Sequence, residues 1–165
     1  MNKNWFALYT KPRAEFKAEE QINSVNIECY LPTITRLKQW SDRKKKVTEP
    51  LLSGYLFIYA NEKERLTALE QNSVVKTISF EGKPAIIPSW QIENLKRLME
   101  KNPEVFISDQ LHTGTLVKVV SGPFRDVEGV IMQVSKDERS LAISIDMLNR
   151  SVLVHLPAES IVKKV

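Results

Sequence analysis

The most informative segment of the chain reads Gly114-Thr-Leu-Val-Lys-Val-Val-Ser-Gly-Pro-Phe-Arg-Asp-Val-Glu-Gly-Val-Ile131. An apolar, β-branched run leads to a Gly122-Pro123 turn, and a second apolar run restarts after Gly129. Short apolar runs broken by Gly-Pro turns are typical of antiparallel strands. Gly122 permits a turn conformation closed to bulkier residues, and Phe124 is placed to cap one end of the sheet. The segment predicts two neighbouring strands.

The same pattern continues to the C-terminus. Residues 114–165 contain fourteen Val or Ile side chains, with further turn signals at 135–138 and 147–149. Four or five short strands at regular spacing predict a small β-barrel. Because about fifty residues is near the lower limit for an independent core, we expect closure of the barrel to matter for its stability.

The N-terminal part has a different pattern, in which strands alternate with amphipathic helices. Apolar residues on both faces of 54–60 predict a central strand. Pro12 suits the first turn of a helix, and Ser89 offers the N-cap of another. The expected strands are 5–9, 27–31, 34–40, 47–49, 54–60, 74–80 and 85–87, and the expected helices are 12–24, 62–71 and 89–101.

These patterns predict an α+β fold in two domains. Residues 1–100 form a sheet layered with helices, and residues 112–165 form the small barrel. Residues 101–111 break both patterns and are the predicted linker.

Composition excludes several classes of protein. The chain is 42% hydrophobic and 27% charged, which argues against disorder, and no apolar run is long enough to cross a bilayer. Cys29 has no partner for a disulfide, and His112 and His155 are isolated, so no cofactor or metal is expected. Residues 81–84 superficially match a phosphate loop, but the upstream glycine is missing and Pro84 stands where the loop has a Ser or Thr. The sequence predicts a cytoplasmic protein without enzymatic activity.

The positive charge is concentrated in one place. Residues 1–100 carry 16 Lys or Arg against 12 Asp or Glu, whereas residues 101–165 carry 8 of each. Between 36 and 46 there are six cations and one anion. This asymmetry favours a polyanionic partner for the first domain.

Three N-terminal stretches have a distinctive order and spacing, namely Trp5-Phe-Ala-Leu-Tyr-Thr-Lys-Pro-Arg-Ala-Glu15, Glu28-Cys-Tyr-Leu-Pro32 and Glu49-Pro-Leu-Leu-Ser-Gly-Tyr-Leu-Phe57. Together they resemble the NGN domain of NusG-type transcription factors. The segment 114–131 resembles the KOW motif, so the resemblance covers the whole chain. The Pro-Ala-Ile-Ile-Pro block at 84–88 is closer to the specialised RfaH and UpxY-like members, which act on polysaccharide operons, than to housekeeping members.

The resemblance implies an apolar surface that binds the clamp helices of bacterial RNA polymerase. For Trp5 and Phe57 the sequence favours packing in the core. Tyr9 and Tyr55 are better candidates for an exposed groove, because one edge of a tyrosine ring tolerates contact with water. A second polymerase contact would fall on Thr67 in the helix that follows the central strand. The positions that match the polymerase-binding surface are Trp5, Tyr9, Leu52, Tyr55, Phe57 and Phe80.

The resemblance also implies contact with upstream and non-template DNA. Lys11 and Arg13 match the DNA-proximal end of the family, and Arg43, Lys44, Lys45 and Lys46 form the tip of the predicted hairpin. Without the resemblance, this run of charged residues would be interpreted as a solvated loop. Trp40 admits two interpretations, stacking on an extruded base or, slightly favoured, packing of the hairpin onto the sheet.

In the second domain, Leu148 and Arg150 match residues that bind ribosomal protein S10 or the terminator Rho. Leu148-Asn149 replaces the Phe-Gly of housekeeping members, which argues against Rho. The β-branched content favours a resident barrel without a switch to helix. We expect a monomer that suppresses pausing and termination. The alternatives are a housekeeping NusG-type factor and a ribosome-associated KOW protein that binds RNA.

Overall fold

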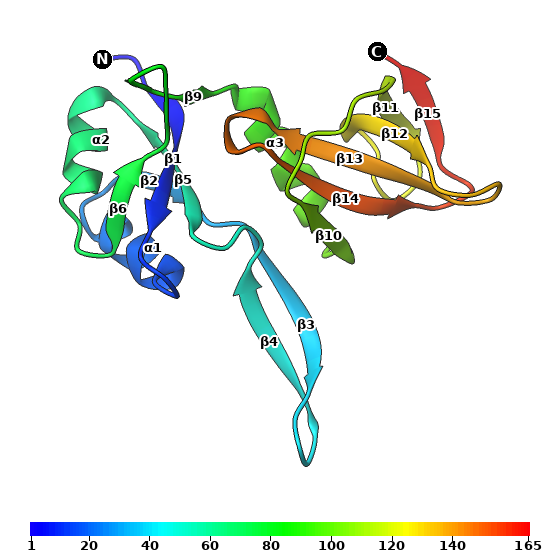
Figure 1. The fold of residues 1–165 in the computed structure, drawn as a ribbon, viewed down its shortest axis with the longest axis horizontal. Coiled ribbons are helices and arrows are strands. Elements are labelled where there is room, and N and C mark those ends of the chain that lie inside the picture. Colours follow the sequence, from blue (N-terminus) through cyan, green and yellow to red (C-terminus); the bar gives the residue numbers. More distant parts are fainter. The chain divides into compact units, whose positions relative to one another are not determined.

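The computed structural model describes residues 1–165 and divides into two compact units, residues 1–87 and 88–165. The first unit is built on an antiparallel sheet with the strand order β2-β5-β1-β6, and β9 also pairs with β1 (Figure 1). The strands are β1 (Asn4–Thr10), β2 (Glu28–Tyr30), β5 (Tyr55–Ala60), β6 (Val74–Thr77) and β9 (Ile86–Ile87).

One face of this sheet forms the core of the first unit. Phe6 of β1 pairs with Ile58 of β5, and Leu8 pairs with Leu56. These side chains are buried in one cluster with Ala18 and other residues of α1 (Glu15–Ser24) and α2 (Glu62–Leu69). The predicted central position of the 54–60 strand is confirmed, because β5 lies between β2 and β1.

The two helices begin for different reasons. Asn61 caps α2 through a capping box, in which its side chain accepts the Glu64 N–H and the Glu64 carboxylate accepts the Asn61 N–H, both at 2.9 Å. α1 begins at Glu15, and the expected start at Pro12 is wrong. Arg13 has a φ of +58°, and this left-handed conformation lies outside the helical region.

Two hairpins complete the first unit. β3 (Thr33–Gln39) pairs only with β4 (Lys44–Pro50) and projects away from the main sheet (Figure 1). β7 (Ser79–Phe80) and β8 (Lys83–Pro84) are joined by a tight turn, so the expected 74–80 strand is split.

The second unit holds α3 (Ser89–Met99) and a six-stranded antiparallel sheet in the order β10-β14-β13-β12-β11-β15. Five of these strands confirm the predicted strands of the C-terminal domain. The strands are β10 (Val105–Ser108), β11 (Leu116–Ser121), β12 (Glu128–Gln133), β13 (Arg139–Ile145), β14 (Arg150–Leu156) and β15 (Ile161–Lys164).

No helix of the structure is both long enough and apolar enough to span a membrane.

The glycine-containing segment that opens this sheet is tightly packed. Gly122 has a φ of +112°, and Phe124 is buried at 8% exposure. A Cβ at Gly129 would lie 2.7 Å from the carbonyl oxygen of Ala142, so only glycine fits there without a shift of backbone.

The division into units differs from the boundary expected from the sequence, which was a first domain of 1–100 and a linker of 101–111. α3 belongs with the second unit, since the Asn94 side chain hydrogen-bonds to the backbone of Glu128. Within the expected linker, β10 pairs with β14 along 105–108. Ser89 was also expected to be the N-cap of α3, and this is wrong. Ser89 is the first residue of the helix, and the N-cap position is held by Pro88, which supplies no side-chain hydrogen bond.

Candidate functional site

The second face of the N-terminal sheet is lined with aromatic rings. In the register of β1 and β5, Trp5 pairs with Tyr59 and Tyr9 with Tyr55. Side chains alternate between faces along a strand, so these residues lie opposite to the face that packs on α1 and α2. We call this surface the aromatic face, and its rings are Trp5, Tyr9, Tyr30, Tyr55, Phe57 and Tyr59.

The rings of the aromatic face contact one another in pairs. The centroids of Trp5 and Tyr59 are 5.4 Å apart, and those of Tyr9 and Tyr55 are 5.5 Å apart at 58°. Tyr30 stacks on Phe57 at 6.3 Å. These spacings lie in the favourable range for aromatic pairs, which adds to the rigidity of the surface.

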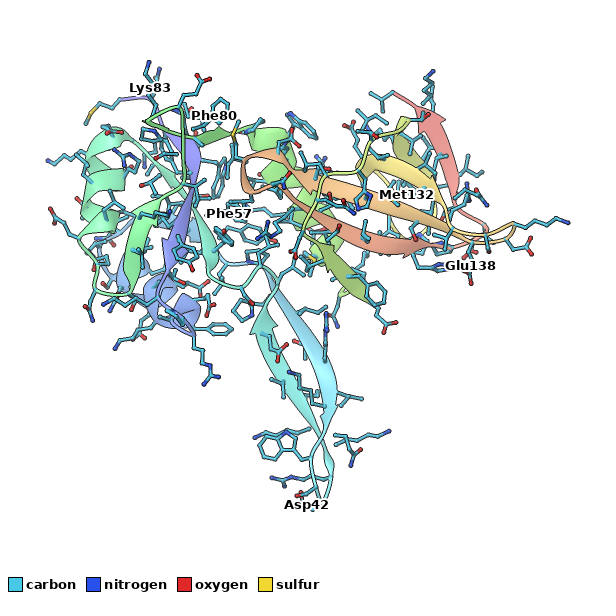
Figure 2. The ribbon with its side chains drawn as sticks, viewed as in Figure 1. Asp42, Phe57, Phe80, Lys83, Met132 and Glu138 are labelled. Atoms are coloured by element: carbon cyan, nitrogen blue, oxygen red, sulfur yellow. The ribbon has the colours of Figure 1, made fainter.

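The predicted polymerase-contact residues divide into a buried and an accessible group. Trp5, Leu52 and Phe57 are buried, which agrees with the core position favoured for Trp5 and Phe57. Tyr9 is 36% exposed, Tyr55 is half-buried, and Phe80 is 62% exposed on the β7–β8 hairpin (Figure 2). The accessible group is therefore Tyr9, Tyr55 and Phe80.

The Tyr9 end of the face is held by a glycine turn. Gly54 has a φ of +84°, and a Cβ there would lie 3.1 Å from the Tyr9 ring. The buried Glu15 carboxylate accepts the Gly54 N–H at 2.9 Å, and the Thr10 N–H donates to the Gly54 carbonyl at 2.8 Å. Lys76 lies with its ammonium 5.9 Å from the Tyr9 ring centroid. These contacts fix the Tyr9 ring beside Tyr55.

Thr67 lies on α2, whose side chains pack on the core face, so the structure does not join it to the aromatic face. It is half-buried, and its hydroxyl donates to the Lys63 carbonyl at 3.1 Å. Its neighbour Arg65 is buried, pairs with Glu62 and donates to the Thr77 hydroxyl at 3.0 Å. Arg65 therefore has a structural role.

The basic run lies mainly on a strand. Lys44, Lys45 and Lys46 belong to β4 and pair with β3, whereas the tip is residues 40–43, closed by the Trp40 N–H donating to the Arg43 carbonyl at 2.7 Å. The sequence expected all of 41–46 to form the tip. The pairing extends further than expected, and the lysines alternate between two solvated faces of the hairpin.

Trp40 does not pack the hairpin onto the sheet, so the slightly favoured interpretation is wrong. The side chain is 43% exposed, and the Lys45 ammonium lies 4.3 Å from its ring centroid. The hairpin, with Asp42 at its tip, extends away from the sheet (Figure 2), and β3 and β4 pair with no other strand.

Lys11 and Arg13 lie in the turn between β1 and α1, and both are exposed. The Lys11 ammonium donates to the Asn72 side chain at 3.2 Å. Since Thr10 bonds to Gly54 just before β5, this turn lies at the end of the sheet where the chain returns from the hairpin. Lys11 and Arg13, which were predicted to contact DNA, therefore lie at one end of the first unit.

Leu148 and Arg150, the predicted contact residues of the second unit, are largely occupied by contacts within that unit. Leu148 ends a short 3-10 helix, η1 (Asp146–Leu148), and is buried at 6% exposure rather than exposed as expected. The Arg150 guanidinium lies 3.4 Å from the Asp109 carboxylate and donates to the Leu148 carbonyl at 3.2 Å. Met147, at 38% exposure, is the accessible apolar side chain of this turn.

Sequence reasoning missed three members of the aromatic face or its edge, namely Tyr30, Tyr59 and Lys76. The alternation of Tyr55, Phe57 and Tyr59 along one strand was the available signal for Tyr59. Tyr30 and Lys76 are placed by strand order, which no local pattern contains.

Cys29 of β2 packs at the border of the core cluster. Burial, reinforced by the nearby Glu19 and Glu28 carboxylates, raises the pKa of its thiol to about 12. The thiolate is the reactive form of cysteine, so this side chain is unsuited to nucleophilic chemistry. His155 is exposed on β14.

Comparison with known proteins gives concordant results. A family model described as transcription termination factor NusG matches residues 3–96. The transcription termination/antitermination protein NusG of Haemophilus influenzae is 24% identical over 147 residues, covering 86% of this chain and 79% of that protein. The protein of the same name from Halalkalibacterium halodurans is 22% identical, with 99% of each chain covered. A solved structure described as domain interaction in Thermotoga maritima NusG is 21% identical, covers 97% of each chain and superposes with a TM-score of 0.52. The last comparison supports the fold.

Proposed function

The chain belongs to the NusG family of transcription factors, and we propose that it is an elongation and antitermination factor that binds the clamp helices of bacterial RNA polymerase. The observation that carries this proposal is the accessible Tyr9–Tyr55 pair at one end of a rigid aromatic face. A helix laid on such a surface buries apolar area while the phenol groups keep one polar edge in water. Phe80, 62% exposed on the separate β7–β8 hairpin, is a further residue that we assign to polymerase binding.

We assign the basic hairpin, with Lys11 and Arg13, to upstream DNA. Contacts of exposed lysines and arginines are made mainly to phosphates, and they position a protein without reading sequence. Clamping of polymerase together with this DNA contact would favour the pause-resistant state of the enzyme. The chain acts in this proposal as a cytoplasmic protein without catalytic activity of its own.

The specialised role at polysaccharide-type operons is part of the proposal, and a transcription assay separates it from a housekeeping role. A specialised factor suppresses pausing only on templates with its own leader DNA, whereas a housekeeping factor acts on unrelated templates. The second unit would recruit ribosomal protein S10 or Rho through the turn at 146–150, where Met147 is the accessible apolar residue.

Co-elution of the full chain with bacterial core RNA polymerase tests the first step. Tyr55→Asp places an uncompensated charge in the proposed contact and should abolish co-elution. Phe16→Asp is the matched control, because Phe16 is a 45% exposed aromatic residue on α1, outside the aromatic face. Circular dichroism establishes that both variants are folded. Equal binding by wild type and Tyr55→Asp would overturn the assignment of the contact face.

A further inference from the structure

The two edges of the sheet in the second unit differ in charge. β15 forms one edge and carries Lys163 and Lys164, side chains of the kind that prevent another strand from pairing with an edge. β10 forms the other edge, and its sequence Val-Phe-Ile-Ser includes no charged residue and no proline. The strand that pairs with β10 is β14 (Figure 1). β10 therefore lacks the usual protection of an edge strand.

The side chains of β10 present apolar surface to water. Phe106 is 66% exposed, and Ile107 is 38% exposed. Neighbouring residues of a strand point to opposite faces, so the two side chains lie on the two sides of the edge. Aromatic and β-branched side chains pair favourably with residues of an adjacent strand. A strand added to β10 would cover both Phe106 and Ile107.

β10 is fixed to the sheet, although the sequence predicts a linker here. The Ser151 hydroxyl donates to the Gln110 carbonyl at 2.9 Å, just after the strand. The Arg150 guanidinium lies 3.4 Å from the Asp109 carboxylate. Because these contacts hold the strand in place, a segment that pairs with it does not have to order it first. The edge is a preformed template.

Acidic residues flank β10 at both ends. Glu104 precedes the strand and Asp109 follows it, and both are exposed. If two copies of the chain paired through antiparallel β10 strands along 105–108, Glu104 of each copy would lie opposite Asp109 of the other. Like charges directly opposite one another destabilise a strand pair. The flanks therefore disfavour a second copy and favour a strand with a cation at each end.

We propose that residues 104–109, which we call the β10 edge, bind an extended segment of a partner protein that adds to the sheet as an antiparallel strand. The segment has apolar residues opposite Phe106 and Ile107, and a lysine or arginine opposite Glu104 and Asp109. In strand addition the main chain supplies affinity and the side chains supply selectivity. The antiparallel direction follows from the sheet, in which every strand pair is antiparallel, the more stable arrangement per residue.

NMR titration of the isotope-labelled full chain with end-capped hexapeptides tests the proposal. The peptide Lys-Thr-Val-Val-Thr-Lys should shift the amide signals of Phe106, Ile107 and Ser108 to saturation. Its counterpart with glutamate at both ends should bind at least about tenfold more weakly. Replacing both valines by proline removes the main-chain donor that faces β10 and should abolish binding.

Phe106→Lys and Val134→Lys form a matched pair of variants. Both replace an exposed apolar residue of the second unit, but Val134, at 60% exposure, follows β12 and lies outside the β10 edge. Phe106→Lys should abolish binding of the lysine-flanked peptide, whereas Val134→Lys should bind as wild type does. Circular dichroism establishes that both are folded. Equal binding by the two variants would overturn the proposal, and so would wild type that binds no peptide at millimolar concentration.

Glu104→Lys tests the direction of pairing. In an antiparallel pair the last residue of the peptide lies opposite position 104. This variant should therefore prefer Lys-Thr-Val-Val-Thr-Glu to Glu-Thr-Val-Val-Thr-Lys by at least about threefold. The opposite preference would show parallel pairing and overturn the antiparallel assignment. Analytical ultracentrifugation tests the other occupant, because wild-type dimers that are lost in Phe106→Lys would assign the edge to a second copy.

Further variants separate the β10 edge from the contacts proposed above, on which it does not depend. Tyr55→Asp should lose polymerase and keep peptide binding, whereas Phe106→Lys should keep polymerase. Met147→Asp changes the accessible apolar residue of the turn assigned to S10 or Rho, and it should also keep peptide binding. Loss of the peptide in Met147→Asp would place it on that turn and overturn the β10 edge as its site.

Discussion

Asn94 of α3 and Glu128 of β12 are joined by two hydrogen bonds in which one side-chain amide satisfies both backbone groups of one residue. The Asn94 amide donates to the Glu128 carbonyl at 2.6 Å, and the Glu128 N–H donates to the Asn94 side-chain oxygen at 2.7 Å. Asn94 is 3% exposed, so water does not replace these bonds easily. This pairing, with the Gln91 amide donating to the Asp146 carboxylate at 3.1 Å, attaches α3 to the sheet of the second unit.

Asn94→Leu should lower the free energy of unfolding by about 2–4 kcal/mol, because it leaves the partly buried N–H and carbonyl of Glu128 without partners. Urea denaturation measures the change. Glu93→Ala, at the adjacent exposed position, is the control and should stay within about 0.5 kcal/mol of wild type. Similar unfolding midpoints for the two variants would show that the pairing contributes little.

Gly129→Ala should destabilise the second unit by about 1–3 kcal/mol, since the new methyl group would meet the Ala142 carbonyl oxygen at 2.7 Å. Thermal unfolding followed by circular dichroism measures the loss. Gly82→Asn is the comparison, because no atom lies within 4 Å of a Cβ there and asparagine tolerates a φ of +77°. If the two variants melt together, the close approach at Gly129 is not limiting.

Phe80→Ala should weaken binding to core polymerase by about tenfold, the effect of removing an aromatic anchor from an interface. At 62% exposure, the ring contributes little to folding, so stability should change by less than about 1 kcal/mol. Phe16→Ala, which removes a similarly exposed ring from α1, should bind as wild type does. Surface plasmon resonance with immobilised polymerase distinguishes the two. Equal affinities would remove Phe80 from the contact.

The thiol of Cys29 should react with Ellman's reagent at pH 9 at least about a hundredfold more slowly in the folded protein than in urea, because burial raises its pKa from 9.0 to about 12. The unfolded thiol ionises first as the pH rises. This group therefore contributes stability that is present below pH 9 and is lost between pH 9 and about 12. Cys29→Ala should flatten that part of the stability profile. A folded thiol that reacts at the unfolded rate would contradict the burial.

Local patterns were sufficient for much of the fold and insufficient where pairing is long-range. The apolar run at 54–60 and the Gly-Pro turn at 122–123 predict strands, because local hydrophobicity and backbone freedom are properties of neighbouring residues. The placement of α3 depends instead on Asn94 meeting an open backbone position at Glu128. Nothing in the helix sequence specifies that partner.

The same limit applies to the candidate site. Tyr9 and Tyr55 were identifiable as tyrosines that tolerate a wet edge, and Phe57 as a core residue. Trp40 was misplaced because its packing depends on where the hairpin goes relative to the sheet. Leu148 was expected at the surface, but the 3-10 turn at 146–148 buries it.

Because β3 and β4 pair only with each other, the length of these two strands sets how far the end of the hairpin lies from the sheet. Antiparallel strands rise by about 3.4 Å per residue, and side chains alternate between faces with a period of two. Removing one residue from each strand would turn Trp40 to the opposite side, whereas removing two from each would restore its side and retract it by about 7 Å. The reach of the indole from the sheet is thus set in discrete steps by strand length, and it can change among relatives without alteration of the core.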